Sequence, residues 1–296
     1  MKNLIYILLC ITFLISCNKE TNSNQERARE QFSQYLGQTP PKVTPIPFAP
    51  GMVTSSEYEY GGTFSADMKE FYYISASDQY EKAKLVMFHY TNNEWKDSII
   101  SDRSGQPVLS PDGKRMYLGR RYKERKSKGW SEIKELGEPF EDQLIMRLSA
   151  ANSGTLYFDT YVPEQPDFPI RYARLINGKY ENPQVLSKNI NTALKNINHP
   201  FIAPDESYLL WDAVREEGYG SSDIYISFKQ DDGSWGEAIN LGDKINTDAW
   251  EASASVTPDG KYLFFSRNMG SDNYENVDIF WVDAKILYDF NTGKQK

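Results

Sequence analysis

The chain has 296 residues, enough for one large domain or two modest ones, and 14% of them are aromatic. Many aromatic residues together with 19 glycines and 15 prolines favour an all-β protein over a helical one. The formal net charge of −8 argues against nucleic acid as a partner, because phosphate binding requires a basic face.

The first 17 residues have the pattern of a bacterial lipoprotein signal peptide. Lys2 supplies a positive n-region, and residues 4–15 form an apolar segment too short to span a bilayer. The segment ends in Leu14-Ile15-Ser16-Cys17, which resembles a lipobox, in which the cysteine becomes the lipidated N-terminus. The sequence therefore predicts lipidation of Cys17; the alternative is an ordinary secretory signal with a chance cysteine.

Two further expectations follow from this segment. Cys10 lies in the part that would be removed, so we expect neither a disulfide framework nor a catalytic cysteine. Asn18 follows the lipobox cysteine, which favours the outer membrane, on its periplasmic side or on the cell surface. Residues 18–47 are polar and then rich in proline, and we interpret them as a tether. The folded domain is expected at residues 48–285, with a C-terminal tail at 286–296.

A short motif recurs five times in this domain. Its clearest copy is Thr257-Pro258-Asp259-Gly260-Lys261, followed by the apolar run Tyr262-Leu263-Phe264-Phe265. Pro, Asp and Gly are the residues that a tight turn requires, so the motif predicts a β-hairpin whose second strand is covered on both faces. We interpret the aspartates as turn residues, not as catalytic groups. The copies begin at residues 65, 110, 150, 203 and 257, in steps of 45, 40, 53 and 54.

A second motif lies between these copies. It consists of a strand, a turn and a strand opened by an aromatic residue, at residues 85–95, 172–180 and 223–235, with a shortened version at Gly129-Trp130. A connector of the form Leu-x3-Ile-Asn-Thr follows at residues 186–192 and 241–247. One unit is therefore two hairpins plus a connector, which matches one four-stranded blade of a β-propeller.

The chain resembles the TolB-like, WD40-like β-propellers whose repeat is named for its Pro-Asp dipeptide. The best matches are residues 110–114, residues 257–261 and Asp223-Ile224-Tyr225. It looks particularly like the lipid-anchored members common in Bacteroidetes-type bacteria. The resemblance covers residues 48–283 and implies an all-β fold of four-stranded antiparallel blades. It is nearly silent on function, because this repeat serves binding proteins, peptidase gates and some sugar-active enzymes.

The number of blades and the closure of the ring need separate arguments. Five copies are visible, whereas TolB itself is six-bladed by resemblance, so the sequence predicts five or six blades. The last copy offers a third strand at residues 278–283 and no clear fourth. We expect an N-terminal strand at about residues 48–56 to close the ring by pairing with the last blade, because this removes a sheet edge.

Four long loops follow the apolar strands, at residues 75–84, 159–169, 213–222 and 267–276. In a propeller they would lie together on one face around the central channel, where ligands usually bind. Exposed aromatic residues beside carboxylates and arginines suit a sugar or a peptide, although ordinary solvated loops are the alternative. We interpret the basic run at residues 120–128 as a solvated hairpin; an anion site is the alternative. The candidate ligand-binding residues are Asp78, Tyr80, Glu164, Asp167, Arg215, Glu216, Tyr219, Arg267, Asn268, Asp272 and Tyr274.

No motif predicts a catalytic, cofactor or metal site. His89 lies within a strand pattern and His199 precedes Pro200, which argues against a histidine-based metal site. The residues Asp231 to Trp235 match the Asp-box of sialidases only in part, and that box is itself a structural turn. The sequence therefore favours a monomeric, non-enzymatic binding or scaffold module that presents one loop face to an envelope protein or a glycan. The alternative is a sialidase-like glycan hydrolase that uses carboxylates and arginines at the channel mouth.

Overall fold

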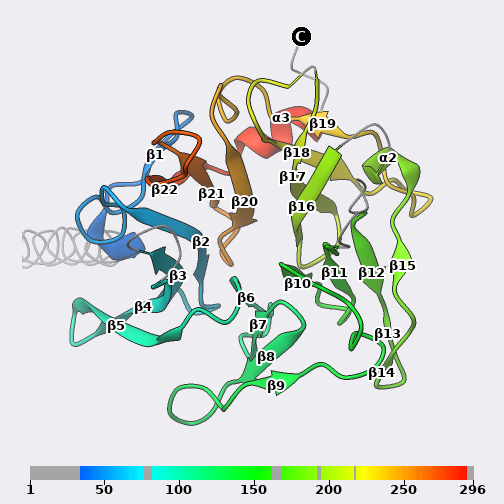
Figure 1. Cartoon of the computed structure of the whole chain (residues 1–296), viewed down its shortest axis with the longest axis horizontal. Helices are drawn as coiled ribbons and strands as arrows, with labels where there is room; N and C mark the ends of the chain where they lie inside the picture. The colour runs from blue at the N-terminus through cyan, green and yellow to red at the C-terminus, as the bar shows by residue number, and fades with distance from the viewer. Residues whose placement is uncertain (1–33, 77–81, 162–168, 192–194, 217, 292–296) are drawn as a thin grey trace, which may run out of the picture.

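The strands of the computed structural model form a ring of five blades around a central axis (Figure 1). The structure describes residues 34–76, 82–161, 169–191, 195–216 and 218–291. Each blade is a four-stranded antiparallel unit, and one parallel bridge between Tyr58 and Val277 joins blades 1 and 5 into an eight-stranded sheet. This confirms the predicted all-β propeller and places it at the lower of the two expected blade numbers.

The blades follow one another in chain order. Blade 1 contains β2 (Tyr58–Phe64), β3 (Glu70–Ala76), β4 (Lys84–Thr91) and β5 (Glu94–Asp102). Blade 2 contains β6 (Pro107–Leu109), β7 (Arg115–Leu118), β8 (Arg121–Glu124) and β9 (Lys134–Glu135). Blade 3 contains β10 (Leu148–Ala150), β11 (Leu156–Phe158), β12 (Arg171–Ala173) and β15 (Gln184–Val185). Blade 4 contains β16 (Lys195–Ile202), β17 (Tyr208–Val214), β18 (Asp223–Phe228) and β19 (Ile239–Asn240). Blade 5 contains β20 (Glu251–Val256), β21 (Tyr262–Asn268), β22 (Val277–Asp283) and β1 (Ile46–Pro47).

The Pro-Asp motifs form the turns between the first and second strands of the blades. Thr257 Oγ1 donates to Asp259 Oδ1 at 2.7 Å, and the same carboxylate oxygen accepts the backbone N–H of Lys261 at 3.2 Å. These bonds hold the turn closed and occupy the carboxylate, which confirms the aspartates as turn residues. The same arrangement recurs at Ser65–Asp67 and at Ser110–Asp112.

The N-terminal segment closes the ring. β1 pairs with β22 in antiparallel orientation, with Ile46 opposite Trp281, and the next residue, Phe48, donates its backbone N–H to Ile279 O at 2.8 Å. This segment therefore supplies the fourth strand of blade 5. The predicted closure is confirmed, with the pairing beginning two residues before the predicted range of 48–56.

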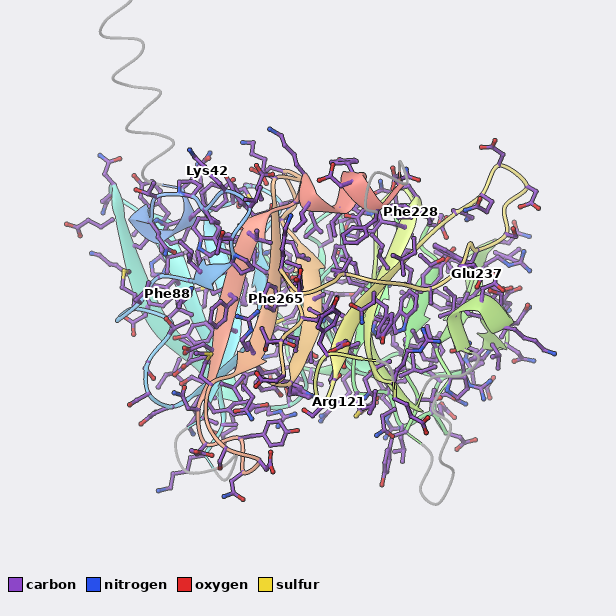
Figure 2. All side chains as sticks on the ribbon, turned by 90° about the horizontal axis from the view of Figure 1, so that it is seen from above. Lys42, Phe88, Arg121, Phe228, Glu237 and Phe265 are labelled. Atoms are coloured by element: carbon purple, nitrogen blue, oxygen red, sulfur yellow. The ribbon has the colours of Figure 1, made fainter. Side chains whose placement is uncertain are left out.

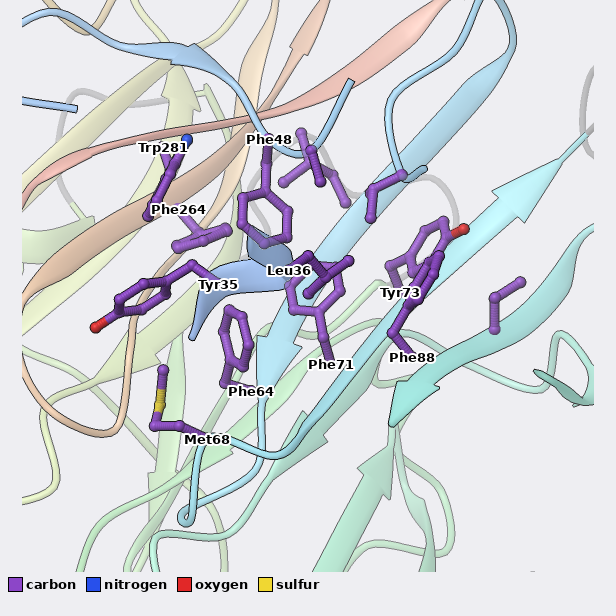
Figure 3. Packing of buried hydrophobic residues seen from close by; sticks show 14 residues of the cluster. Tyr35, Leu36, Phe48, Phe64, Met68, Phe71, Tyr73, Phe88, Phe264 and Trp281 are labelled. Atoms are coloured by element: carbon purple, nitrogen blue, oxygen red, sulfur yellow. The ribbon is translucent and has the colours of Figure 1, made fainter. Parts of the chain in front are cut away.

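The apolar strands are buried on both faces by neighbouring blades. Phe264 and Phe265 are consecutive in β21 and point to opposite sides. Phe264 belongs to the cluster between blades 5 and 1, which Figure 3 shows with Phe48 among the aromatic rings. Phe265 belongs to the cluster shared with blade 4, which also contains Leu210 and Ile226. This two-sided burial explains why the strand lacks the polar alternation of a half-exposed strand.

The structure differs from the sequence interpretation at the outer strands of blades 3 and 4. In blade 3, the residues around Asn177-Gly178 form a separate hairpin of β13 (Leu175–Ile176) and β14 (Lys179–Tyr180), and β12 pairs with β15 instead. In blade 4, Trp235 makes an isolated bridge, and β18 pairs with β19. Both fourth strands therefore lie immediately before the Leu-x3-Ile-Asn-Thr connector, within which α2 (Lys188–Asn191) lies in blade 3.

The chain packs onto the propeller earlier than the tether interpretation of residues 18–47 implies. The short helix η1 (Tyr35–Gly37) places Tyr35 and Leu36 in the cluster between blades 5 and 1, with 1% and 6% of their surfaces exposed. Proline-rich composition suggested an extended approach, but Tyr35 contributes an aromatic ring 4.9 Å from that of Tyr262. At the other end of the chain, α3 (Ile286–Asn291) packs onto the cluster between blades 4 and 5.

Candidate functional site

The two faces of the propeller carry different loops. We call the face with the Pro-Asp turns the turn face, and the opposite one, with the loops between second and third strands, the loop face. In Figure 2, Lys42 and Arg121 lie at opposite edges of the molecule, Lys42 on the turn side and Arg121 on the loop side. The N-terminal segment contacts the turn face, where Tyr35 O–H donates to Asp259 Oδ2 at 2.5 Å.

A cavity of about 680 Å³ opens on the loop face over blade 2. It forms because the loop between β7 and β8 consists of only Gly119 and Arg120. Gly119 has φ of 69°, and a Cβ there would lie 2.5 Å from Ile145 O, so only glycine allows the backbone at Ile145 to pass this closely. We call this hollow the arginine cavity, because its lining includes Arg103, Arg120 and Arg121.

The arginines of this cavity are held in place by neighbouring backbone. Arg120 donates to the carbonyl oxygen of Glu141, and Arg121 donates to that of Ser104. The guanidinium of Arg103 lies 5.2 Å from the ring centre of Tyr60. A guanidinium has five N–H donors, so the bonds of Arg120 and Arg121 to these carbonyl oxygens orient the two side chains and leave further donors for a ligand. Among the described lining residues, Glu135 is the only carboxylate.

Beneath the arginine cavity lies a buried charged cluster. His199, which also lines the cavity, places Nδ1 3.0 Å from Asp212 Oδ1, and that oxygen accepts the Ser253 N–H at 2.9 Å. Asp159 accepts the N–H groups of His199 at 2.8 Å and of Arg147 at 2.8 Å. Burial alone would lower the pKa of His199, but the charge of Asp212, its hydrogen bond to the ring and the charge of Asp159 together raise the pKa above its ordinary value.

Two residues of this cluster, Arg147 and His199, belong to a ring of equivalent positions in the five blades. The turn-opening residues correspond because each donates its backbone N–H across the turn: Ser65, Ser110, Ala151, Ala203 and Thr257. The third turn is one residue shorter than expected, so it opens at Ala151 and not at Ala150. Four residues before these openers stand Gly61, Gln106, Arg147, His199 and Ser253, which we call the channel ring.

Three members of the channel ring occupy β-bulges. Gly61, His199 and Ser253 have φ of 72°, 50° and 59°, and in each case the pairing of the first two strands shifts register at this point. Bulges re-aim side chains and are common near functional sites. A left-handed conformation is costly for His and Ser, which indicates that the surrounding packing imposes it.

Several solved structures are similar to this chain at low sequence identity. TolB from Acinetobacter baumannii is 14% identical, with a TM-score of 0.46, over 81% of this chain and 62% of its own. This chain therefore spans about three fifths of that protein. An α-L-arabinofuranosidase from Lactobacillus brevis is 11% identical, with a TM-score of 0.49, over 77% of this chain and 91% of its own. An endo-arabinase from Bacteroides thetaiotaomicron VPI-5482 is 17% identical, with a TM-score of 0.47, over 80% and 96%. No family model and no curated protein matches the chain.

The predicted loop residues are only partly described. Asp78, Tyr80, Glu164 and Asp167 lie outside the described residues. Tyr219 is 51% exposed, and Glu216 and Asp272 are also exposed. The guanidinium of Arg215 lies over the ring of Tyr225, and the ring of Tyr274 packs edge-on against that of Trp250. Asn268 holds its own loop by donating to Ser271 O at 2.8 Å. A ligand-binding role for these residues stays a prediction.

Arg267 is engaged inside the protein. Its Nε donates to Glu251 Oε1 at 2.7 Å and its Nη2 to Ile245 O at 2.8 Å, and its guanidinium lies 4.6 Å from the ring centre of Phe280. Sequence reasoning placed Arg267 among exposed loop residues because it ends an apolar run. The residues of the arginine cavity were less visible in sequence: Arg120 and Arg121 were part of a basic run, and Arg103 and His199 carried no motif.

Within the described residues, no group of three or more His, Cys, Asp or Glu is arranged to hold a metal ion, and no helix is long and apolar enough to cross a membrane.

One buried carboxyl on the loop side predicts a pH effect on stability. Glu59 corresponds to Glu251 by position in its blade, and its oxygens accept the O–H of Ser55 at 2.7 Å and its N–H at 3.2 Å. Burial raises the pKa of Glu59 to about 7, despite these hydrogen bonds. A carboxyl whose pKa is higher in the folded state favours folding at low pH, so its contribution is lost as pH rises from about 4.5 to about 7.

We therefore expect the Glu59→Gln variant to lose less stability than the parent between pH 5 and pH 8, because the amide does not ionise. Urea unfolding of both proteins at the two pH values measures this. Glu132→Gln, at an exposed position in blade 2, serves as the control and should follow the parent. Identical pH dependence in Glu59→Gln and the parent would contradict the prediction.

Proposed function

We propose that the protein is a binding module that holds an acidic sugar unit of a glycan in the arginine cavity. The observation that carries the proposal is the convergence of three arginines on one concave surface of the loop face. The cavity volume of about 680 Å³ lies in the range of small-molecule sites. The planar guanidinium matches a carboxylate with two parallel hydrogen bonds, and Tyr161, 46% exposed at the edge, offers an aromatic surface for a sugar ring.

A hydrolase would need a different set of groups. Glycoside hydrolysis requires two carboxyl groups a set distance apart on either side of the scissile bond. Of the described residues in the lining, Glu135 alone carries one, and it lies 3.7 Å from Arg120. Asp159 and Asp212 beneath the cavity are occupied by backbone N–H groups and by His199. The hydrolase alternative would draw on Glu164 and Asp167, and the experiment below separates it from binding.

The same proposal includes an anchor. We propose lipidation at Cys17 and attachment of a monomeric propeller to the outer membrane, on its periplasmic or cell-surface side. The position of the N-terminal segment on the turn face supports an orientation of the propeller relative to the membrane. Tyr35 contacts Asp259 on the turn face, so a tether that precedes it would leave from that face. The loop face, with the arginine cavity, would then point away from the membrane.

Binding is tested on the chain from residue 18 onward, which keeps every described residue. We expect saturable binding of an oligosaccharide bearing uronic or sialic acid and no binding of its carboxyl-reduced counterpart, measured by titration calorimetry. The double variant Arg120→Gln/Arg121→Gln should lose about tenfold or more in affinity, because a hydrogen bond to a charged group contributes about 1.5–3 kcal/mol. Arg174→Gln is the matched control, since Arg174 pairs with Glu181 on a surface hairpin.

Three other results would overturn the proposal. Binding that survives in the double variant would place the ligand elsewhere. Saturable binding of an acidic peptide, without any of an acidic glycan, would replace the glycan by a protein segment. Release of sugar from the oligosaccharide, abolished in Glu164→Gln or Asp167→Asn, would establish the hydrolase.

A further inference from the structure

A second cavity opens at the centre of the turn face. Its volume is about 330 Å³, and each of the five blades contributes to its lining. The rim is formed by the second residue of each repeat turn: Ala66, Pro111, Asn152, Pro204 and Pro258. This cavity is thus the turn-side mouth of the central channel. It shares no lining residue with the arginine cavity on the loop face.

The walls of this channel pocket are mixed in polarity. Two residues before each turn opener, the five blades supply two apolar side chains and three hydroxyls: Thr63, Val108, Ser149, Phe201 and Ser255. Ser149 Oγ accepts the backbone N–H of Ile202 at 3.0 Å, which fixes its orientation. Apolar walls with a few placed polar groups are typical of a site for a small organic molecule, and the volume is at the lower end of that class.

Arg147 lines the inner end of the pocket. Only 2% of its surface is exposed, and neither Nε nor Nη1 has a hydrogen-bond partner. Burial lowers the pKa of Arg147 to about 10, against the raising effects of Asp212 and Asp159, so the guanidinium still carries its charge at neutral pH. Buried donors in native proteins are almost always paired, so two unpaired N–H groups on one guanidinium indicate an acceptor that completes the site.

The neighbouring carboxylates are directed elsewhere. Asp159 Oδ1 accepts the N–H groups of Met146 and Arg147, and its Oδ2 accepts that of His199. Asp212 is hydrogen-bonded to His199 and to the Ser253 N–H. The unpaired atoms of Arg147, Nε and Nη1, are both donors, so the missing partner is an acceptor.

We propose that the channel pocket binds a small organic monocarboxylate, with its carboxylate on Arg147 and its apolar body against Val108 and Phe201. A single buried guanidinium close to two aspartates favours a monoanion over a phosphate dianion, whose second charge would be repelled by Asp159 and Asp212. The walls exclude a purely inorganic anion as the full occupant, because such an ion would leave the apolar part of the pocket empty.

The test uses hexanoate and phenylacetate as probes, with hexanamide and phenylacetamide as uncharged counterparts. Titration of the chain from residue 18 onward, followed by calorimetry and by ligand-observed NMR, should show saturable binding of the acids and at least about tenfold weaker binding of the amides, as expected for loss of a charge-assisted bond. Arg147→Gln should abolish this preference for the acids.

A second variant keeps the proposal testable if Arg147→Gln fails to fold. Ala66 is exposed at the rim, and Ala66→Trp should block the mouth and weaken acid binding by about tenfold or more without altering the core. Met52→Trp, at an exposed position outside the pocket, is the control and should bind as the parent does. Absence of saturable binding for both acids would mean that water alone fills the pocket. Binding that is unchanged in Ala66→Trp would place it elsewhere, and either result overturns the proposal.

Discussion

Replacing Phe48 by alanine is expected to cost about 3–5 kcal/mol of unfolding free energy, the range for deleting a fully buried aromatic side chain. Phe48 is 0% exposed, and its ring lies 4.8 Å from that of Phe71 and 4.8 Å from that of Phe264. Those two residues belong to blades 1 and 5. The lost ring therefore leaves a cavity at the seam where the chain closes the propeller, in addition to removing apolar contact area.

The position of Phe48 makes the effect larger than at an ordinary core site. Its N–H continues the pairing of β1 with β22, so the side chain also fixes the strand that covers the outer edge of blade 5. Chemical denaturation of the parent, Phe48→Ala and Met52→Ala measures the effect. Met52 is 43% exposed in the same segment, and its variant should stay within about 0.5 kcal/mol of the parent. A loss below about 1 kcal/mol in Phe48→Ala would mean that this segment does not hold the ring closed.

The fold could be predicted from sequence because its signals are local. Turns of the Thr257–Lys261 type dictate hairpins wherever they occur, and apolar runs such as 263–265 require cover on both faces. Ring closure was predictable as the remedy for an unpaired edge, but its exact residues were not. The sequence around Pro45 and Pro47 predicts a stiff tether, but Pro47 lies in an edge strand. An edge strand tolerates proline, because no further strand needs a hydrogen bond from the N–H that proline lacks.

The candidate sites were harder to predict, because they depend on register and on distant partners. The alternation of residues along a strand does not predict which side chains form the channel ring. Bulges at Gly61, His199 and Ser253 shift the strand pairing by one residue, so the alternation is broken there. The arginine cavity depends on the short loop between β7 and β8. Long loops are where the sequence predicts binding residues, and this short loop is not among them. The side chains at equivalent positions of the repeats differ, but these positions can be compared only after the structure has aligned the blades.

Arg267 is another residue whose role depends on a distant partner, and its replacement is expected to cause a large loss of stability. Glu251 is 0% exposed; burial raises the pKa of its carboxyl, while Thr247 and Arg267 lower it and keep the pair together. Removing one partner of a buried ion pair costs about 3–5 kcal/mol, because an uncompensated charge stays behind. We expect this loss for Arg267→Met in denaturant unfolding at pH 8. The corresponding loss for Arg174→Met, whose side chain is 55% exposed where it pairs with Glu181, should be no more than about 1 kcal/mol.

The pH dependence and a double variant distinguish a charge effect from lost packing of Arg267 on Phe280. Without Arg267 the pKa of Glu251 rises further, so the carboxyl binds a proton more readily in the folded state, and the deficit of Arg267→Met should shrink as pH falls from 8 to 5. Glu251→Gln/Arg267→Met should recover part of the loss at pH 8, since the oxygen of a neutral amide can still accept the Thr247 N–H and its NH2 can donate to Thr247 Oγ1. A deficit that is independent of pH and unchanged in the double variant would assign the role of Arg267 to packing over the aromatic ring.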